Sequence, residues 1–63
     1  MDEGLKSEVA ALLLEGYGVK TSRDFCALKP QELAGLYTDL KAIAARRGLT
    51  DAEMEAVLEA ILG

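Results

Sequence analysis

The chain has 63 residues, a formal net charge of -4 and a mean hydropathy of +0.14. This length accommodates one small core, so we expect a single helical domain over residues 1–63. Hydrophobic residues make up 51% of the chain and charged residues 29%, a balance typical of globular rather than disordered proteins. The longest uncharged apolar run, Val9 to Leu14, is far shorter than the roughly 20 residues of a membrane-spanning helix. We therefore expect no membrane segment.

The residue types that are missing or rare narrow the function. There is no His, which is both the commonest general acid or base and the commonest metal ligand. A chain this small also encloses a catalytic pocket with difficulty. We expect no enzymatic activity, no cofactor, no metal and no small-molecule substrate. The one cysteine, Cys26, excludes an internal disulfide and fits a cytoplasmic protein. Its apolar neighbours predict a buried, inert thiol.

Apolar residues recur every three or four positions in the first half of the chain, which predicts helices. The first helix should run over residues 3–15 and end at Gly16. Its apolar face comprises Leu5, Val9, Leu12 and Leu13. Because Leu12, Leu13 and Leu14 together exceed what one stripe can bury, we expect one of them to be exposed, marking a partner surface. A shorter helix over residues 22–28 should bury Phe25 and Leu28.

The second half of the chain carries clear helix boundaries. Pro30 suits a first helical position, and Gly48 suits the left-handed position after a helix end. Thr50 and Glu53 form a capping-box pattern at the start of the last helix. The apolar faces of these two helices are predicted at Leu33, Leu36, Tyr37, Leu40, Ile43 and Ala44, and at Met54, Val57, Leu58, Ile61 and Leu62. The only doubtful position is Gly35, which weakens a helix unless close packing requires it.

These elements predict an all-α fold: a compact single-domain bundle of four or five short helices. So small a core gives modest stability, because the area buried barely exceeds the entropy of ordering the chain. Dimerisation or docking to a partner would relieve this shortfall. The first indication of function is therefore an interaction with another protein.

The segment from Leu13 to Thr21 joins two predicted helices through the turn Gly16-Tyr17-Gly18. It resembles the helix-hairpin-helix motif of repair, recombination and replication proteins. That resemblance implies that the hairpin backbone holds a DNA phosphate. The candidate phosphate-binding residues are Gly16, Gly18, Lys20, Thr21 and Arg23.

The charge balance points the other way, because nucleic-acid binders usually carry a basic surface and this chain has 11 acidic against 7 basic residues. A local basic patch of Lys20, Arg23 and Lys29 remains, and Arg46 and Arg47 would join it only if the fold brings both turns to one side. The simpler interpretation is that Gly16 and Gly18 only end one helix and turn the chain.

The same stretch also resembles helical interaction modules of the sterile alpha motif type. The residues that carry this resemblance are Gly18, Val19, Thr21, Asp24, Phe25, Leu28, Glu32, Leu33 and Leu36. In such modules surface charge mediates head-to-tail or heterotypic contacts between proteins. The acidic last helix, opposite a Lys20, Arg23 and Lys29 edge, would suit such contacts.

The leading hypothesis is a small non-enzymatic protein–protein interaction or regulatory module, self-associating or binding another protein. Its candidate interface residues are Leu12, Leu14, Tyr17 and Lys29. The alternative is a helix-hairpin-helix domain that binds nucleic acid through backbone phosphates with low sequence specificity. A third hypothesis is a small inhibitor whose acidic surface fits a basic groove on an enzyme or polymerase.

Overall fold

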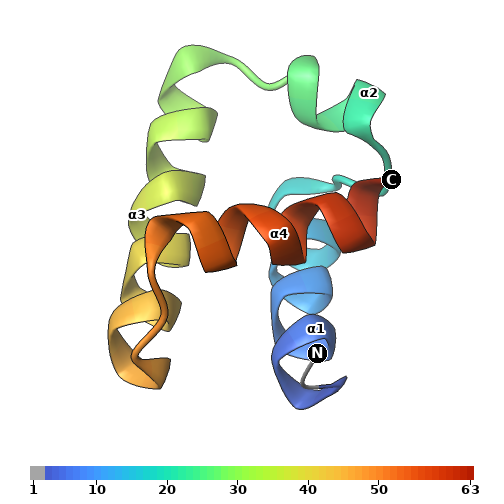
Figure 1. The fold of residues 1–63 in the computed structure, drawn as a ribbon. Coiled ribbons are helices and arrows are strands. Elements are labelled where there is room, and N and C mark those ends of the chain that lie inside the picture. Colours follow the sequence, from blue (N-terminus) through green and yellow to red (C-terminus); the bar gives the residue numbers. More distant parts are fainter. Residues whose placement is uncertain (1–2) are drawn as a thin grey trace.

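A computed structural model describes residues 3–63, and these residues fold into helices joined by short turns (Figure 1). The elements are α1 (Glu3–Ala11), a π-helical turn η1 (Leu12–Gly16), α2 (Ser22–Cys26), α3 (Pro30–Arg47) and α4 (Asp51–Leu62). This part of the chain contains no strand, so the predicted all-α fold is confirmed. None of its helices is both long and apolar enough to cross a bilayer.

The first helix reaches the predicted end but changes its winding on the way. Over Leu12–Gly16 the backbone widens into a π-helical turn, which the sequence pattern did not predict. The widened turn leaves Leu13 fully buried and Leu14 47% exposed. The expectation that one of the three leucines is exposed is thus confirmed. The chain then reverses at Gly18, whose φ of 66° is left-handed and favours glycine.

The predicted boundaries of α3 and α4 are confirmed in detail. Pro30 is the first residue of α3, and Gly48 follows its end with a left-handed φ of 71°. There the Leu49 amide donates to the Ala44 carbonyl at 2.8 Å. At the start of α4 the Glu53 amide donates to the Thr50 hydroxyl at 3.1 Å, and the Thr50 amide donates to the Glu53 carboxylate at 2.9 Å. The hydrogen bond from the Thr50 amide to the carboxylate is the largest cause that lowers the pKa of Glu53 below its ordinary value.

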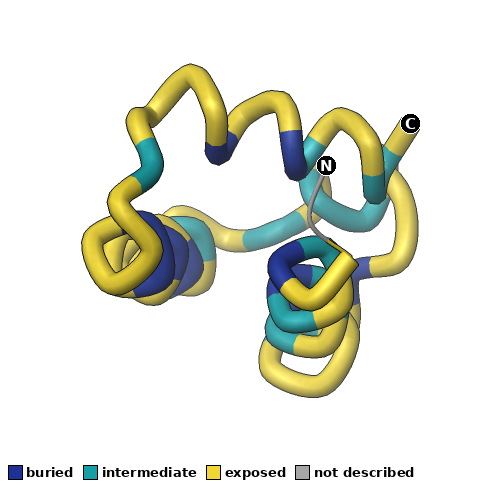
Figure 2. Tube along the Cα trace, turned by 60° about the horizontal axis from the view of Figure 1, so that its bottom comes forward, coloured by how far each residue is buried: buried dark blue, intermediate teal, exposed yellow. Residues whose placement is uncertain are grey.

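The core lies where α1, η1, α3 and α4 face one another, as the dark segments in Figure 2 show. Its buried side chains are Leu5, Val9, Leu13, Val19, Leu36, Leu40, Ile43, Ala44, Met54 and Val57. No residue of α2 belongs to it. Phe25 and Leu28, which were expected to be buried, are only partly so. The core is therefore built from α1, η1, α3 and α4 together with Val19 from the turn before α2, and α2 packs on its margin.

Polar contacts join α1 and the end of η1 to α3, which runs in the opposite direction (Figure 1). Near one end the Glu8 carboxylate pairs with Arg46 and accepts a hydrogen bond from Arg47 at 3.0 Å. These cations lower the pKa of Glu8, chiefly through the hydrogen bond from Arg46. Toward the other end the Tyr17 hydroxyl donates to Asp39 at 2.8 Å. Helix α4 crosses both α1 and α3 and contacts each of them.

Candidate protein-binding groove

The backbone amides of residues 18–20, in and just after the Gly16–Gly18 turn, donate hydrogen bonds within the chain. The Gly18 amide donates to the Leu14 carbonyl at 3.0 Å, and the Val19 amide donates to the Leu13 carbonyl at 2.8 Å. The Lys20 amide donates to the Asp24 carboxylate at 3.1 Å. Three consecutive amides that a bound phosphate would use are therefore satisfied within the chain, and a carboxylate already occupies the start of α2.

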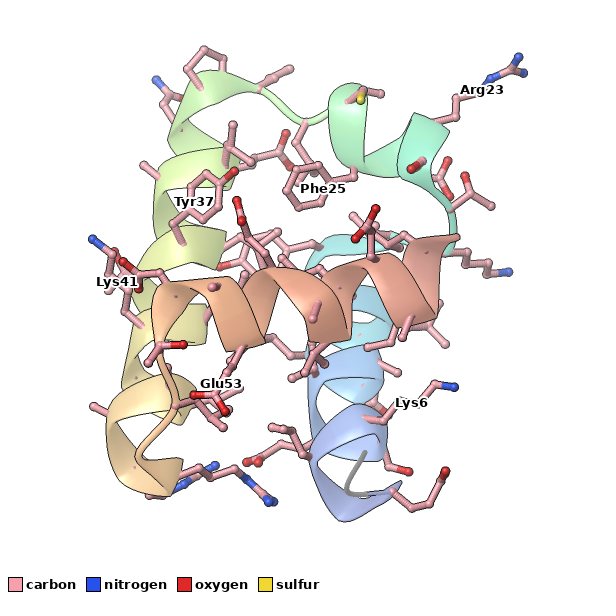
Figure 3. All side chains as sticks on the ribbon, viewed as in Figure 1. Lys6, Arg23, Phe25, Tyr37, Lys41 and Glu53 are labelled. Carbon is pink, nitrogen blue, oxygen red and sulfur yellow. The ribbon has the colours of Figure 1, made fainter. Side chains whose placement is uncertain are left out.

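The structure does not bring Arg46 and Arg47 to the segment that carries Lys20 and Arg23. Arg23 extends outward from α2, away from the body of the molecule (Figure 3). Arg46 and Arg47 pair with Glu8. Glu8 comes before Gly16 in the sequence, and the two residues are about 12 Å apart along the helix axis. Arg46 and Arg47 therefore do not join a basic patch around the turn. Lys20 and Thr21 are exposed, and the Thr21 hydroxyl caps α2 by accepting the Asp24 amide at 3.3 Å.

The residues predicted to form a protein interface are also dispersed. Leu14 is exposed on η1, whereas Leu12 packs partly against the core. Tyr17 reaches across to α3, where its hydroxyl bonds Asp39. Lys29 is exposed at the start of α3, with its amide donating to the Glu32 carboxylate at 3.1 Å. Of this set, Leu14 is the large apolar side chain that faces solvent.

The prediction that Cys26 is a buried thiol is wrong, because Cys26 is exposed. The helix that carries it has five residues, and none of them is buried. So short a segment turns only one side toward the core, and Phe25 occupies that side. Apolar neighbours in the sequence were therefore a poor guide to burial at this position.

The hollow surface of the molecule runs along α4, on the side that faces α2 and α3. One hollow, of about 190 Å³, is lined by Tyr37, Leu40, Lys41, Ala44, Asp51, Met54, Glu55 and Leu58. A second, of about 420 Å³, is lined by Ser22, Phe25, Tyr37, Glu55, Leu58, Glu59, Leu62 and Gly63. Tyr37, Glu55 and Leu58 line both hollows, so the two adjoin. We call them together the α4 groove.

Two aromatic rings form the wall of the α4 groove that faces α4. Phe25 comes from α2 and Tyr37 from α3, and Figure 3 shows the two side chains directed toward each other. Their ring centroids lie 6.3 Å apart with the planes at 74°, an edge-to-face arrangement that aromatic pairs favour. Tyr37 remains 46% exposed, although the sequence pattern placed it on the apolar face of its helix. A large ring is thus presented to solvent inside a concave surface.

Helix α4 supplies the opposite wall through two rows of side chains. Asp51, Glu55 and Glu59 succeed one another every fourth residue and form an acidic row. Met54, Leu58 and Leu62 do the same and form an apolar row beside it. In an α-helix such a row is inclined by about 26° to the axis, and its successive members are about 6 Å apart along the axis. All six side chains line the groove.

From the sequence, these side chains were assigned only to the apolar face and to the solvated face of the last helix. The structure places them opposite Phe25 and Tyr37, and this placement depends on how α2 and α3 pack. The signal that could have pointed to the groove is the surplus of apolar residues on the last helix. Leu58 and Leu62 belong to its stripe, yet both are only partly buried.

Comparisons of the chain with models of protein families, with curated proteins and with solved structures found no match.

Proposed function

We propose that this protein is a small, non-enzymatic interaction module that binds an apolar segment of another protein in the α4 groove. The observation that carries the proposal is Tyr37, a residue that is 46% exposed at the junction of the two hollows. Exposed aromatic side chains in concave apolar surroundings are the usual anchors of protein interfaces. We place the protein in the cytoplasm, because an exposed thiol such as Cys26 persists best in a reducing compartment.

The dimensions of the groove support a macromolecular ligand rather than an enclosed small molecule. The two adjoining hollows extend along α4 from Asp51 to Gly63, and a helix of 12 residues is about 18 Å long. A site of this length suits a peptide segment that contacts several side chains in sequence. The proposal also agrees with the resemblance to sterile alpha motif modules, which bind other proteins through their surfaces.

Two exposed apolar side chains allow a matched test. Tyr37 lies in the groove and is 46% exposed, and Leu14 lies on η1 outside it and is 47% exposed. Peptides of about sixteen residues would be selected from a displayed library against the wild-type protein. Their affinities would then be measured for Tyr37→Ser and Leu14→Ser, after circular dichroism has shown that both variants are folded.

We expect Tyr37→Ser to weaken binding by about ten-fold or more, as truncation of a central aromatic anchor does. Leu14→Ser should leave the affinity unchanged. Loss of binding in Leu14→Ser alone would place the interface on η1 and overturn the proposal. Failure to select any peptide, together with tight binding of duplex DNA that Lys20→Glu abolishes, would favour the nucleic-acid hypothesis instead.

A further inference from the structure

The acidic row of the α4 groove is not paired with a cation in the part of the chain that the structure describes. Within residues 3–63, no Lys or Arg forms an ion pair with Asp51, Glu55 or Glu59. The chain from Gly48 to the end of α4 carries four carboxylates and no basic residue. Among the residues that line the groove, Lys41 is the basic one, and it lies on α3 near the start of α4 (Figure 3).

The negative charge is therefore concentrated toward the Leu62 end of the groove. Glu59 lies at that end, whereas Lys41 lies at the other. The last turn of α4 contains no basic side chain, so its carbonyl groups add the negative end of the helix dipole. A ligand that brings positive charge to this end would interact favourably with both.

The two rows of side chains on α4 also favour a ligand of a particular shape. The acidic row and the apolar row each repeat every fourth residue, and the two run side by side along α4. Rows of this kind pack best against the equivalent rows of a second helix, whose side chains fill the spaces between them. A partner helix would place apolar side chains near Leu58 and Leu62 and cations near Glu55 and Glu59.

Building on the proposed function, we propose that the partner segment is an amphipathic α-helix with Lys or Arg every fourth residue beside its apolar stripe. Tyr37 and Leu58 contact the apolar stripe of this helix, and the acidic row pairs with its cations. Complementary charge of this kind selects the partner and speeds association more than it adds affinity. The apolar contacts supply most of the binding energy.

The absence of Trp from this chain permits a direct measurement. Three synthetic helical peptides of about sixteen residues would share one apolar stripe with a single Trp. Their polar edge would carry Lys, Gln or Glu every fourth residue, and Trp fluorescence would report binding. The protein variants are Glu55→Gln/Glu59→Gln, in the groove, and Glu3→Gln/Glu15→Gln, which removes the same charge from exposed positions of α1 and η1.

We expect the Lys peptide to bind most tightly and the Glu peptide least tightly. The Glu55→Gln/Glu59→Gln variant should weaken the Lys peptide by about five-fold and remove most of the difference between peptides. The Glu3→Gln/Glu15→Gln variant should retain it. Equal affinity for the Lys and Gln peptides, with both still lost in Tyr37→Ser, would overturn the basic partner and leave the proposed function intact.

Two other results would carry different conclusions. Binding of no peptide, or binding that Tyr37→Ser does not change, would overturn the proposed function as well as the basic partner. The same variants would be examined by light scattering over a range of protein concentration. A dimer that Tyr37→Ser dissociates would show that a second copy of this chain fills the groove, and would overturn the separate basic partner.

Discussion

The hydroxyl group of Tyr17 donates a hydrogen bond to Asp39 at 2.8 Å, joining the end of η1 to the middle of α3. In reaching Asp39 it passes directly over Gly35. A Cβ atom added at Gly35 would lie 3.2 Å from the Tyr17 hydroxyl, which is tighter than ordinary contact. The close approach that would justify a glycine in the interior of this helix is therefore present.

The contact predicts coupling between the two positions. In a helix alanine is more favourable than glycine by about 1 kcal/mol, so Gly35→Ala would stabilise α3 if nothing lay above it. We expect little or no gain in the wild-type protein, because the new methyl group displaces the Tyr17 hydroxyl. In a Tyr17→Phe background the gain should approach the full amount. Urea unfolding of the four proteins of this double-mutant cycle would measure it, and identical effects in both backgrounds would show no contact.

The same hydrogen bond predicts a loss of stability at alkaline pH. Donation to Asp39, with burial and the charge of Asp39 in smaller part, raises the pKa of Tyr17 above its ordinary value. As pH rises past that ordinary value, near 10, the unfolded chain loses the phenolic proton before the folded protein does. The stabilisation is complete below this pH and disappears as pH rises through the folded-state pKa.

Unfolding midpoints measured between about pH 9 and about pH 11 would test this dependence. Tyr17→Phe should decline less steeply than the wild-type protein over this interval. Tyr37→Phe is the matched control, since it also removes one phenol, and it should decline as the wild-type protein does. Equal slopes for Tyr17→Phe and the wild-type protein would contradict the raised pKa.

The two threonines of the C-terminal half should respond to alanine in opposite directions. Thr50 caps α4 by accepting the Glu53 amide, so Thr50→Ala should destabilise the protein by about 1 kcal/mol. Thr38 lies inside α3 and donates to the Ala34 carbonyl at 3.0 Å. Because alanine is the better helix former, Thr38→Ala should stabilise the protein by a few tenths of a kcal/mol. Thermal unfolding would show the difference, and a neutral Thr50→Ala would argue against the cap.

The two glycines of the first turn should also differ. Gly18 has a φ of 66°, and the left-handed conformation costs an L-residue about 1–2 kcal/mol. Gly16 is the last residue of η1, where an added Cβ would meet Leu12 at an ordinary 3.5 Å. We expect Gly18→Ala to be destabilising by about that cost and Gly16→Ala to be close to neutral. The free energies of urea unfolding would separate them, and a neutral Gly18→Ala would rule out a strained turn.

The parts of the fold that could be predicted from the sequence are those that depend on local signals. The boundaries of α3 and α4 are set by Pro30, Gly48 and the Thr50–Glu53 capping box. Each of these acts on residues within one helical turn, so its effect can be predicted from the sequence. The π-helical winding of Leu12–Gly16 was not predictable in this way. No residue there demands a wider turn by itself, and the winding accompanies the packing of Leu13 into the core.

The candidate site was less predictable than the fold, because it depends on contacts between distant segments. Glu55 and Leu58 were recognised on α4, and Phe25 and Tyr37 were assigned to other apolar faces. Their meeting in one groove requires the position of α2, which has no buried residue to fix it in the core. The Gly16–Gly18 turn attracted a phosphate-binding interpretation because its sequence does not reveal that its amides are already bonded.

The most direct test of the account is a map of amide chemical shifts in the ¹⁵N-labelled protein as the Lys-bearing helical peptide is added. We expect the affected amides to cluster at the α4 groove, with the largest changes at Phe25, Tyr37, Leu58 and Leu62. Changes confined to the Gly16–Arg23 turn or to Leu14, with those four amides unmoved, would contradict it.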